Sequence, residues 1–126
     1  MKTQKQRIGI WGENEAVEFL QKKGYVLFAR NFRTRFGEVD IIAWDEKKHF
    51  GKTLCFIEVK TRTYGEGNAE RATGKEKLRR LFMASRAFCL RHTINIENTP
   101  IQFEQVSIYG QENDVDHIDH YVIPID

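Results

Sequence analysis

The sequence has little of several features that mark particular classes of protein. It holds only two cysteines, Cys55 and Cys89, without the spacing of a metal site, so we expect buried thiols in a reducing cytoplasm rather than a disulfide framework. No apolar run approaches the length of a membrane span, which excludes a transmembrane helix. Residues 1–7 are not followed by an apolar segment of the signal-peptide type, and we therefore expect a cytoplasmic protein.

Positive charge is also missing from one end of the chain. All 20 lysines and arginines lie in residues 1–91 beside 11 acids, which gives this part a net charge of +9. Residues 92–126 hold 7 acids and no lysine or arginine, so their net charge is −7. A basic body suits a polyanion such as nucleic acid, although charged runs are most often solvated faces. The acidic segment leaves another interpretation open, in which it docks a basic protein.

The length of 126 residues, with 40% apolar and 30% charged residues, predicts one soluble globular domain over 1–126. Hydrophobic periodicity then predicts the order of its elements. These are a helix over 4–23, strands over 25–33, 37–43 and 54–60, a helix from a Thr73 capping box to 92, a strand over 101–109, and a short strand or irregular tail over 115–125. The fold class is therefore α/β, and the strands before and after the second helix should be parallel.

Three details of this pattern carry expectations about the helices and the loop between them. Gly24 should end the first helix, and Glu13 is an anomaly because an acid there lies in line with the apolar stripe. The second helix should bury Leu78, Leu81, Phe82, Ser85, Phe88 and Cys89. Residues 64–68 contain two glycines in a polar run, which indicates either a mobile loop beside the site or a plain connector.

The strands at 37–43 and 54–60 are unusual because each carries acid at one end, where a buried strand should carry none. If they form an antiparallel hairpin, the turn falls between residues 45 and 52. The midpoint of Asp40 and Glu58 is position 49, so these two carboxylates should lie nearly opposite each other. Side chains alternate along a strand, which places Lys60 on the face of Glu58.

Two carboxylates held together repel unless a cation relieves the repulsion. A hard divalent ion such as Mg²⁺ or Mn²⁺ takes carboxylate oxygens, keeps several waters and can activate a phosphate and a water. A nearby lysine can hold the water or stabilise charge on the phosphate. The alternative is a structural ion-pair network at the edge of a sheet. In such a network, two acids and one base would leave one negative charge without a partner.

At these residues the sequence resembles a known family. Asp40 followed by Glu58-x-Lys60 on the next strand resembles the signature of the PD-(D/E)xK nucleases. The two strands together resemble the YraN-like family of small proteins, which are similar to archaeal Holliday junction resolvases. The resemblance covers roughly residues 7 to 109, and the segment beyond Gly110 fits it least well.

The resemblance implies a restriction-endonuclease-like core, a central mixed sheet flanked by helices in the order α-β-β-β-α-β, with an extra edge strand left open. It implies that Asp40 and Glu58 hold Mg²⁺ or Mn²⁺, with the Val59 carbonyl as a third ligand, and that Lys60 acts on the water or the phosphate. Glu13 joins the metal site in this pattern, helped by the preceding Gly12, although a solvated glutamate favoured by the helix dipole is an equal alternative. Glu38 is a further acidic candidate.

Basic residues near these strands are candidates for contact with phosphates. Arg33 and Arg35 alternate with aromatic residues, a pattern that suits either phosphate binding or a strand with outward arginines. Arg62 and Lys75 complete the predicted nucleic-acid-binding set. Asp116, His117, Asp119 and His120 suggest a metal cluster, but alternation in an extended segment divides them between two faces.

The sequence therefore favours a metal-dependent endonuclease that hydrolyses DNA phosphodiester bonds, with branched or damaged DNA as the substrate that the resemblance suggests. A nucleic-acid-binding module that keeps the fold without turnover is the main alternative. The oligomeric state stays open, a homodimer included.

Overall fold

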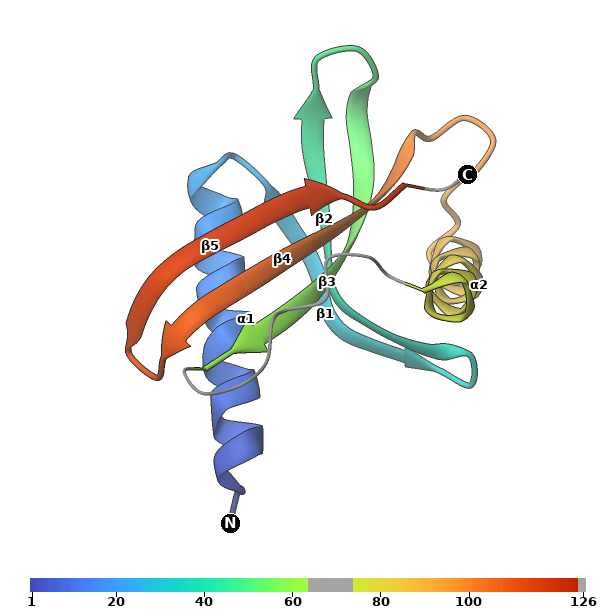
Figure 1. The fold of residues 1–126 in the computed structure, drawn as a ribbon. Coiled ribbons are helices and arrows are strands. Elements are labelled where there is room, and N and C mark those ends of the chain that lie inside the picture. The colour runs from blue at the N-terminus through green and yellow to red at the C-terminus, as the bar shows by residue number, and fades with distance from the viewer. Residues whose placement is uncertain (64–73, 125–126) are drawn as a thin grey trace.

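The computed structural model describes residues 1–63 and 74–124, and its centre is one five-stranded mixed sheet (Figure 1). The strands lie in the order β1-β2-β3-β4-β5, which is also their order along the chain. The elements are α1 (Gln4–Lys22), β1 (Val26–Thr34), β2 (Gly37–Lys47), β3 (Gly51–Arg62), α2 (Lys75–Arg91), β4 (Ile101–Gln111) and β5 (Asp114–Val122). The predicted α/β class is confirmed, and the order of the elements is consistent with a restriction-endonuclease-like core. The additional edge strand is β5.

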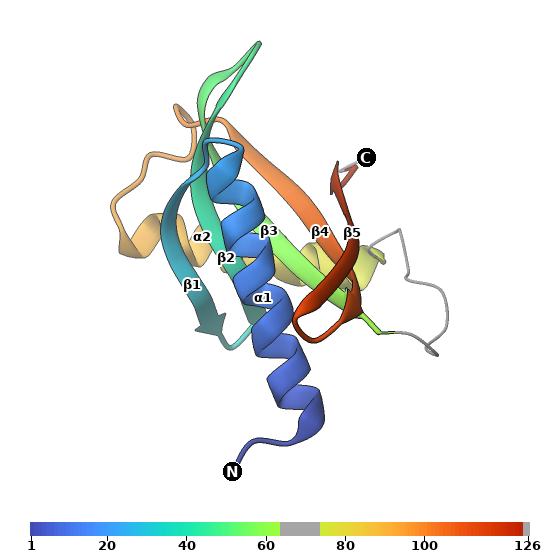
Figure 2. The same ribbon diagram turned by 90° about the vertical axis from the view of Figure 1, so that its left-hand side faces the viewer.

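The two helices cover opposite faces of the sheet (Figure 2). On one face Trp11, Ala16 and Leu20 of α1 pack with residues such as Ile57 of β3. On the other face Leu81, Ala84 and Phe88 of α2 pack with Phe56 and Phe103. The central strand β3 is therefore buried on both sides, which explains its continuous apolar run. No helix in the described residues is long and apolar enough to span a membrane.

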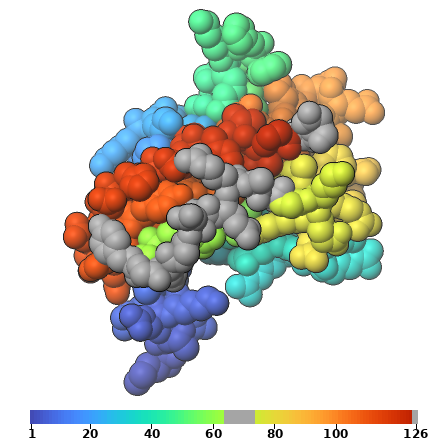
Figure 3. Space-filling model, in the orientation of Figure 1, coloured from blue at the N-terminus to red at the C-terminus, as the bar shows by residue number. Residues whose placement is uncertain are grey.

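Helix α1 begins and ends as local signals require. Thr3 caps it, because the Thr3 hydroxyl accepts a hydrogen bond from the Gln6 amide at 3.1 Å and the Gln6 side chain accepts one from the Thr3 amide at 2.9 Å. Gly24 follows the last turn with φ of 97°, a left-handed conformation that favours glycine. Figure 3 shows that the first turns of α1 and the tip of the β2–β3 hairpin project from opposite ends of the molecule.

The β2–β3 hairpin has the predicted register but a tighter turn. Its pairs run from Lys47 with Gly51 to Ile41 with Ile57, so the strands continue to within three residues of each other. β3 pairs parallel with β4 through α2, as predicted. β5 pairs antiparallel with β4 along its whole length, so the strand alternative for the C-terminal segment is the one that the fold adopts.

The expectations for α2 need two corrections. Phe82 is 44% exposed, and the buried stripe passes through Ala84 instead, because the face of α2 that packs on the sheet is turned toward Ala84 and away from Phe82. The cap of α2 is Gly74, which has no side chain to accept a hydrogen bond. Thr73, the residue expected to cap the helix, and the loop 64–68 lie outside the described residues.

A buried polar network joins four elements on the α1 side of the sheet. Glu104 of β4 is 0% exposed and accepts hydrogen bonds from Tyr25 at 2.8 Å and from Gln102 at 2.6 Å. Its other contacts are Lys47 at 2.9 Å and the His120 Nε2 at 2.8 Å. Burial alone would raise the pKa of Glu104, but these hydrogen bonds lower it to about 2. Glu104 and Glu112, which lies 3.5 Å from Arg7, show that part of the acidic C-terminal segment binds the chain's own bases.

Candidate active site

The predicted site lies where β2 and β3 separate. Their paired register ends at Ile41 and Ile57, and the next position brings Asp40 to Glu58, as the sequence predicted. Asp40 Oδ2 accepts a hydrogen bond from the Val59 amide at 2.8 Å. The Asp40 carboxylate thus accepts the hydrogen bond that a backbone carbonyl of β2 would accept in a regular sheet. This bond holds the Asp40 side chain between the two diverging strands.

Strict alternation along β2 breaks at Asp40. Val39 and Ile42 both pack in the cluster under α2, whereas Ile41 packs in the cluster under α1. Across from this point in β1, Asn31 has a φ of 53°, a left-handed conformation uncommon for residues other than glycine. The irregularity leaves Asp40 in one cleft with Glu38 and Glu13.

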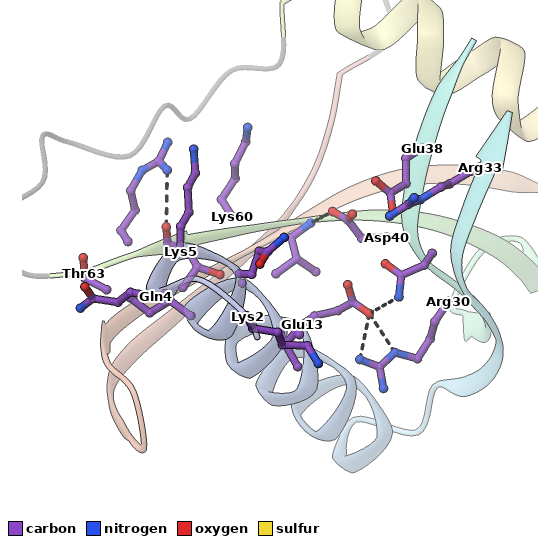
Figure 4. Close-up of a pocket in the computed structure, with 18 residues that line it drawn as sticks. Lys2, Gln4, Lys5, Glu13, Arg30, Arg33, Glu38, Asp40, Lys60 and Thr63 are labelled. Atoms are coloured by element: carbon purple, nitrogen blue, oxygen red, sulfur yellow. Dashed lines mark hydrogen bonds and ion pairs between the residues drawn. The ribbon is translucent and has the colours of Figure 1, made fainter. Parts of the chain in front are cut away.

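This cleft has a volume of about 1330 Å³ and lies between the first half of α1 and the ends of β1, β2 and β3 (Figure 4). Its acids are Glu13, Glu38 and Asp40. Its bases are Lys2, Lys5, Arg30, Arg33, Lys60 and Arg62. Six bases against three acids give the cleft an excess of positive charge around a small acidic centre, which suits a phosphate-bearing ligand.

Glu13 is held at the cleft by close packing of α1 on β3. A Cβ atom on Gly12 would lie 2.0 Å from the Thr61 hydroxyl oxygen, so only glycine permits this approach. Glu13 Oε1 accepts hydrogen bonds from Arg30 Nε at 2.9 Å and from Asn31 at 3.1 Å. The anomaly seen in the sequence therefore has a structural reason, and Arg30 already neutralises the carboxylate proposed to join a metal site.

Asp40 sits in an unfavourable place for a negative charge. Burial raises its pKa to about 6, and the neighbouring Glu58, Glu13 and Glu38 add to the rise, while the Val59 amide opposes it. A carboxylate destabilised in this way gains most from a cation close by. Within the described residues, however, no three His, Cys, Asp or Glu side chains are grouped so as to hold a metal ion.

Glu58 faces away from the cleft, toward α2, and is not among the described residues that line it. Its Oε1 forms an ion pair with Lys77 of α2 and lies 4.0 Å from the Lys60 ammonium. Its Oε2 is buried and has no hydrogen-bond partner. Carboxylate oxygens of this kind are the ligands that Mg²⁺ or Mn²⁺ takes, because these ions bind through one or two carboxylates and complete their shells with water.

Lys77 is the residue that sequence reasoning missed. It precedes Leu81 by one helical turn and so lies in line with the buried stripe of α2. The same signal, a charged residue in line with an apolar stripe, had singled out Glu13 and would have singled out Lys77. Lys77 also affects Lys60. Burial is the larger cause that lowers the pKa of Lys60, and the neighbouring Lys77 ammonium is the second cause.

The predicted nucleic-acid-binding residues are divided by the fold. Arg33 and Arg62 line the cleft, and Arg33 lies 3.4 Å from Glu38. The Arg35 guanidinium lies 5.0 Å from the centre of the Phe36 ring, and Lys75 is the first residue of α2. Neither Arg35 nor Lys75 is among the described residues of the cleft wall, so only the first two are placed to contact a ligand bound there.

We expect Asp40→Asn to stabilise the protein at pH 8 in the absence of metal. The folded pKa of about 6 exceeds the ordinary value of 3.8, so the wild-type carboxyl is favourable below about pH 4 and loses this benefit as the pH rises through 6. The difference between the proteins should be small at pH 4 and reach about 2–3 kcal/mol at pH 8. Urea unfolding at both pH values measures it, and an asparagine variant less stable at pH 8 would refute this electrostatic picture.

Comparison with known proteins gives one consistent family. The model of the family described as "Uncharacterised protein family UPF0102" matches residues 12–108. Among similar proteins, one from Desulforapulum autotrophicum is 32% identical over 114 residues, covering 90% of this chain and 88% of its own. One from Desulfosudis oleivorans is 37% identical over 119 residues, covering 94% and 91%. One from Koribacter versatilis is 43% identical over 106 residues, covering 82% and 68%. All three are named as UPF0102 proteins.

Proposed function

Because the chain belongs to the uncharacterised family UPF0102, the YraN-like proteins, we propose that it is a metal-dependent endonuclease that hydrolyses phosphodiester bonds in DNA. The observation that carries this proposal is the position of Asp40. It is a half-buried carboxylate held between diverging strands, next to Glu58 and Lys60, and it opens on a basic cleft. Branched or damaged DNA is the substrate that we propose on the resemblance to junction resolvases.

Asp40 and Glu58 would hold Mg²⁺ or Mn²⁺, with the Val59 carbonyl as a further oxygen and Glu13 at its edge. When bound, such an ion polarises a phosphate and lowers the pKa of a coordinated water. The protein's own contribution is to keep the two carboxylates together despite their repulsion. The Val59 amide does this for Asp40, and the ion pair with Lys77 does it for Glu58.

Lys60 is the residue placed to act on the reacting groups. Its ammonium lies 4.0 Å from Glu58 Oε1, and Lys60 is among the residues that line the cleft. A lysine whose pKa is lowered by burial and by a neighbouring cation can take a proton from water or donate a hydrogen bond to a phosphate oxygen. We assign Lys60 this role.

The cleft bases would bind the DNA backbone rather than read its sequence. Lys5 belongs to α1 and Lys2 precedes it, while Arg33 belongs to β1 and Arg62 to the end of β3. No aromatic side chain is among the described residues that line the cleft, so none of these residues can stack on a base. Contacts to phosphate position a substrate without specifying bases.

The proposal is tested by incubating wild-type protein and Asp40→Asn with linear, flapped and four-way-junction DNA. Each substrate is tried with Mg²⁺, with Mn²⁺ and with a chelator. We expect wild-type protein to cut at least one substrate when metal is present and not in chelator, and Asp40→Asn to cut none. Failure of wild-type protein to cut any of them with either metal would overturn the nuclease assignment.

One observation favours the alternative of a binding module without turnover. Two of the acids near Asp40 are already paired with the chain's own bases, Glu13 with Arg30 and Glu58 with Lys77. Such a protein would bind DNA with a steep dependence on salt, because its bases release counterions from phosphates, yet it would cut nothing. Binding measured at several salt concentrations beside the cleavage assay separates the two.

A further inference from the structure

The ion pair between Lys77 and Glu58 joins the candidate site to the helix on the far face of the sheet. Glu58 belongs to β3 and its side chain is only 15% exposed, whereas Lys77 belongs to the first turn of α2 and its side chain is 44% exposed. The carboxylate is therefore fixed in the protein, and the ammonium reaches it from the surface.

The two oxygens of Glu58 are in opposite situations. Oε1 is shared by Lys77 and Lys60, while Oε2 is buried without a hydrogen-bond partner. A buried acceptor left unpaired costs free energy, and a side chain with a purely structural role should have both oxygens satisfied. This arrangement is incomplete in a way that an additional cation would complete.

We propose that Lys77 is an exchangeable internal cation, which neutralises Glu58 while the site holds no divalent ion and leaves the carboxylate when that ion binds. This inference rests on the proposed metal site. Lys77 acts here as a positioning residue, since it governs the state of Glu58 and touches no reacting atom. An ammonium and a divalent ion on one carboxylate repel each other, so binding of the ion weakens the hold on Lys77.

The structure allows this exchange without a change of fold. Lys77 is half exposed on a helix surface, and four methylene groups connect its charge to the backbone. Its ammonium can turn into solvent while Leu81, Ala84 and Phe88 keep α2 packed on the sheet. Lys60 stays on the strand beside Glu58, so the site keeps one lysine after the other has left.

The test is the affinity of purified protein for Mn²⁺ without DNA, measured by titration calorimetry. Lys77→Met removes the competing charge but keeps the length of the side chain, so Mn²⁺ should bind about tenfold more tightly, a coupling typical of groups in contact. Lys77→Arg keeps a cation and should stay near wild type. Arg79→Met removes the same charge from an exposed position on the same helix and should also bind like wild type.

Each outcome separates this inference from the proposed function. Equal or weaker Mn²⁺ binding by Lys77→Met, with wild-type protein binding normally, would overturn the exchange and leave the metal site standing. Tighter binding in Arg79→Met as well would assign the effect to net charge and also overturn it. If neither wild type nor Lys77→Met binds Mn²⁺, the metal site itself fails and the exchange fails with it. Thermal melting of each variant shows that loss of binding is not loss of fold.

Discussion

Lys60→Ala is expected to lower the rate of metal-dependent DNA cleavage by about 10²–10⁴-fold, as loss of a positioned proton-transfer group does. Lys60 is the one lysine in the described residues that both lines the cleft and lies beside Glu58. Affinity for Mn²⁺ should not fall, because an ammonium donates no ligand to a cation and competes with it for Glu58. Affinity for DNA should fall only modestly, because one phosphate contact among several is lost.

The measurement is single-turnover cleavage of the substrate that wild-type protein cuts best, with Mn²⁺ calorimetry on the same preparations. Lys52→Ala is the matched control, because Lys52 lies on the same strand but stacks over Trp44 in the far part of the hairpin. It should cleave like wild type. Unchanged cleavage by Lys60→Ala would remove Lys60 from the mechanism. A sharp fall in melting temperature with no activity to lose would instead indicate a structural ion-pair network.

The second large effect concerns stability rather than chemistry. Glu104→Ala should lower the free energy of unfolding by about 3–5 kcal/mol, the usual cost of removing one partner from a buried charged network. Lys47 and Tyr25 lose the Glu104 carboxylate as their shared acceptor, and His120 of β5 loses its side-chain contact with the same carboxylate. Equilibrium unfolding in urea measures this. Glu97→Ala, at an exposed loop position, should change stability by less than about 0.5 kcal/mol.

The same network should govern stability in acid. The pKa of Glu104 is lowered from 4.5 to about 2 in the folded protein, so its contribution is complete above about pH 4.5 and is lost as the pH falls through 2. Stability of Glu104→Gln should therefore fall less steeply than that of wild type between pH 5 and pH 2. Parallel curves for the two proteins would show that Glu104 is not the group responsible.

Local patterns in the sequence were sufficient to predict the helices and strands and one long-range contact. Alternating and helical patterns predicted α1, the hairpin strands and the parallel crossover through α2, because short-range sterics and burial of an apolar face dictate these. The register that carries Asp40 and Glu58 to the same end of the hairpin was also predictable, since an antiparallel hairpin has one register once its turn is placed. Glu13 stood out because a charge in line with an apolar stripe needs a partner.

The partners of these charged residues depend on how the helices and strands pack. Glu58 turns toward α2 and Lys77, a choice set by which face of β3 each helix covers. Glu104 lies in β4 without any local sign of burial, and its partners come from the loop after α1, from β2 and from β5. A buried charge is stable only when groups distant in sequence converge on it, and that convergence depends on how the strands and helices pack, which no local pattern specifies.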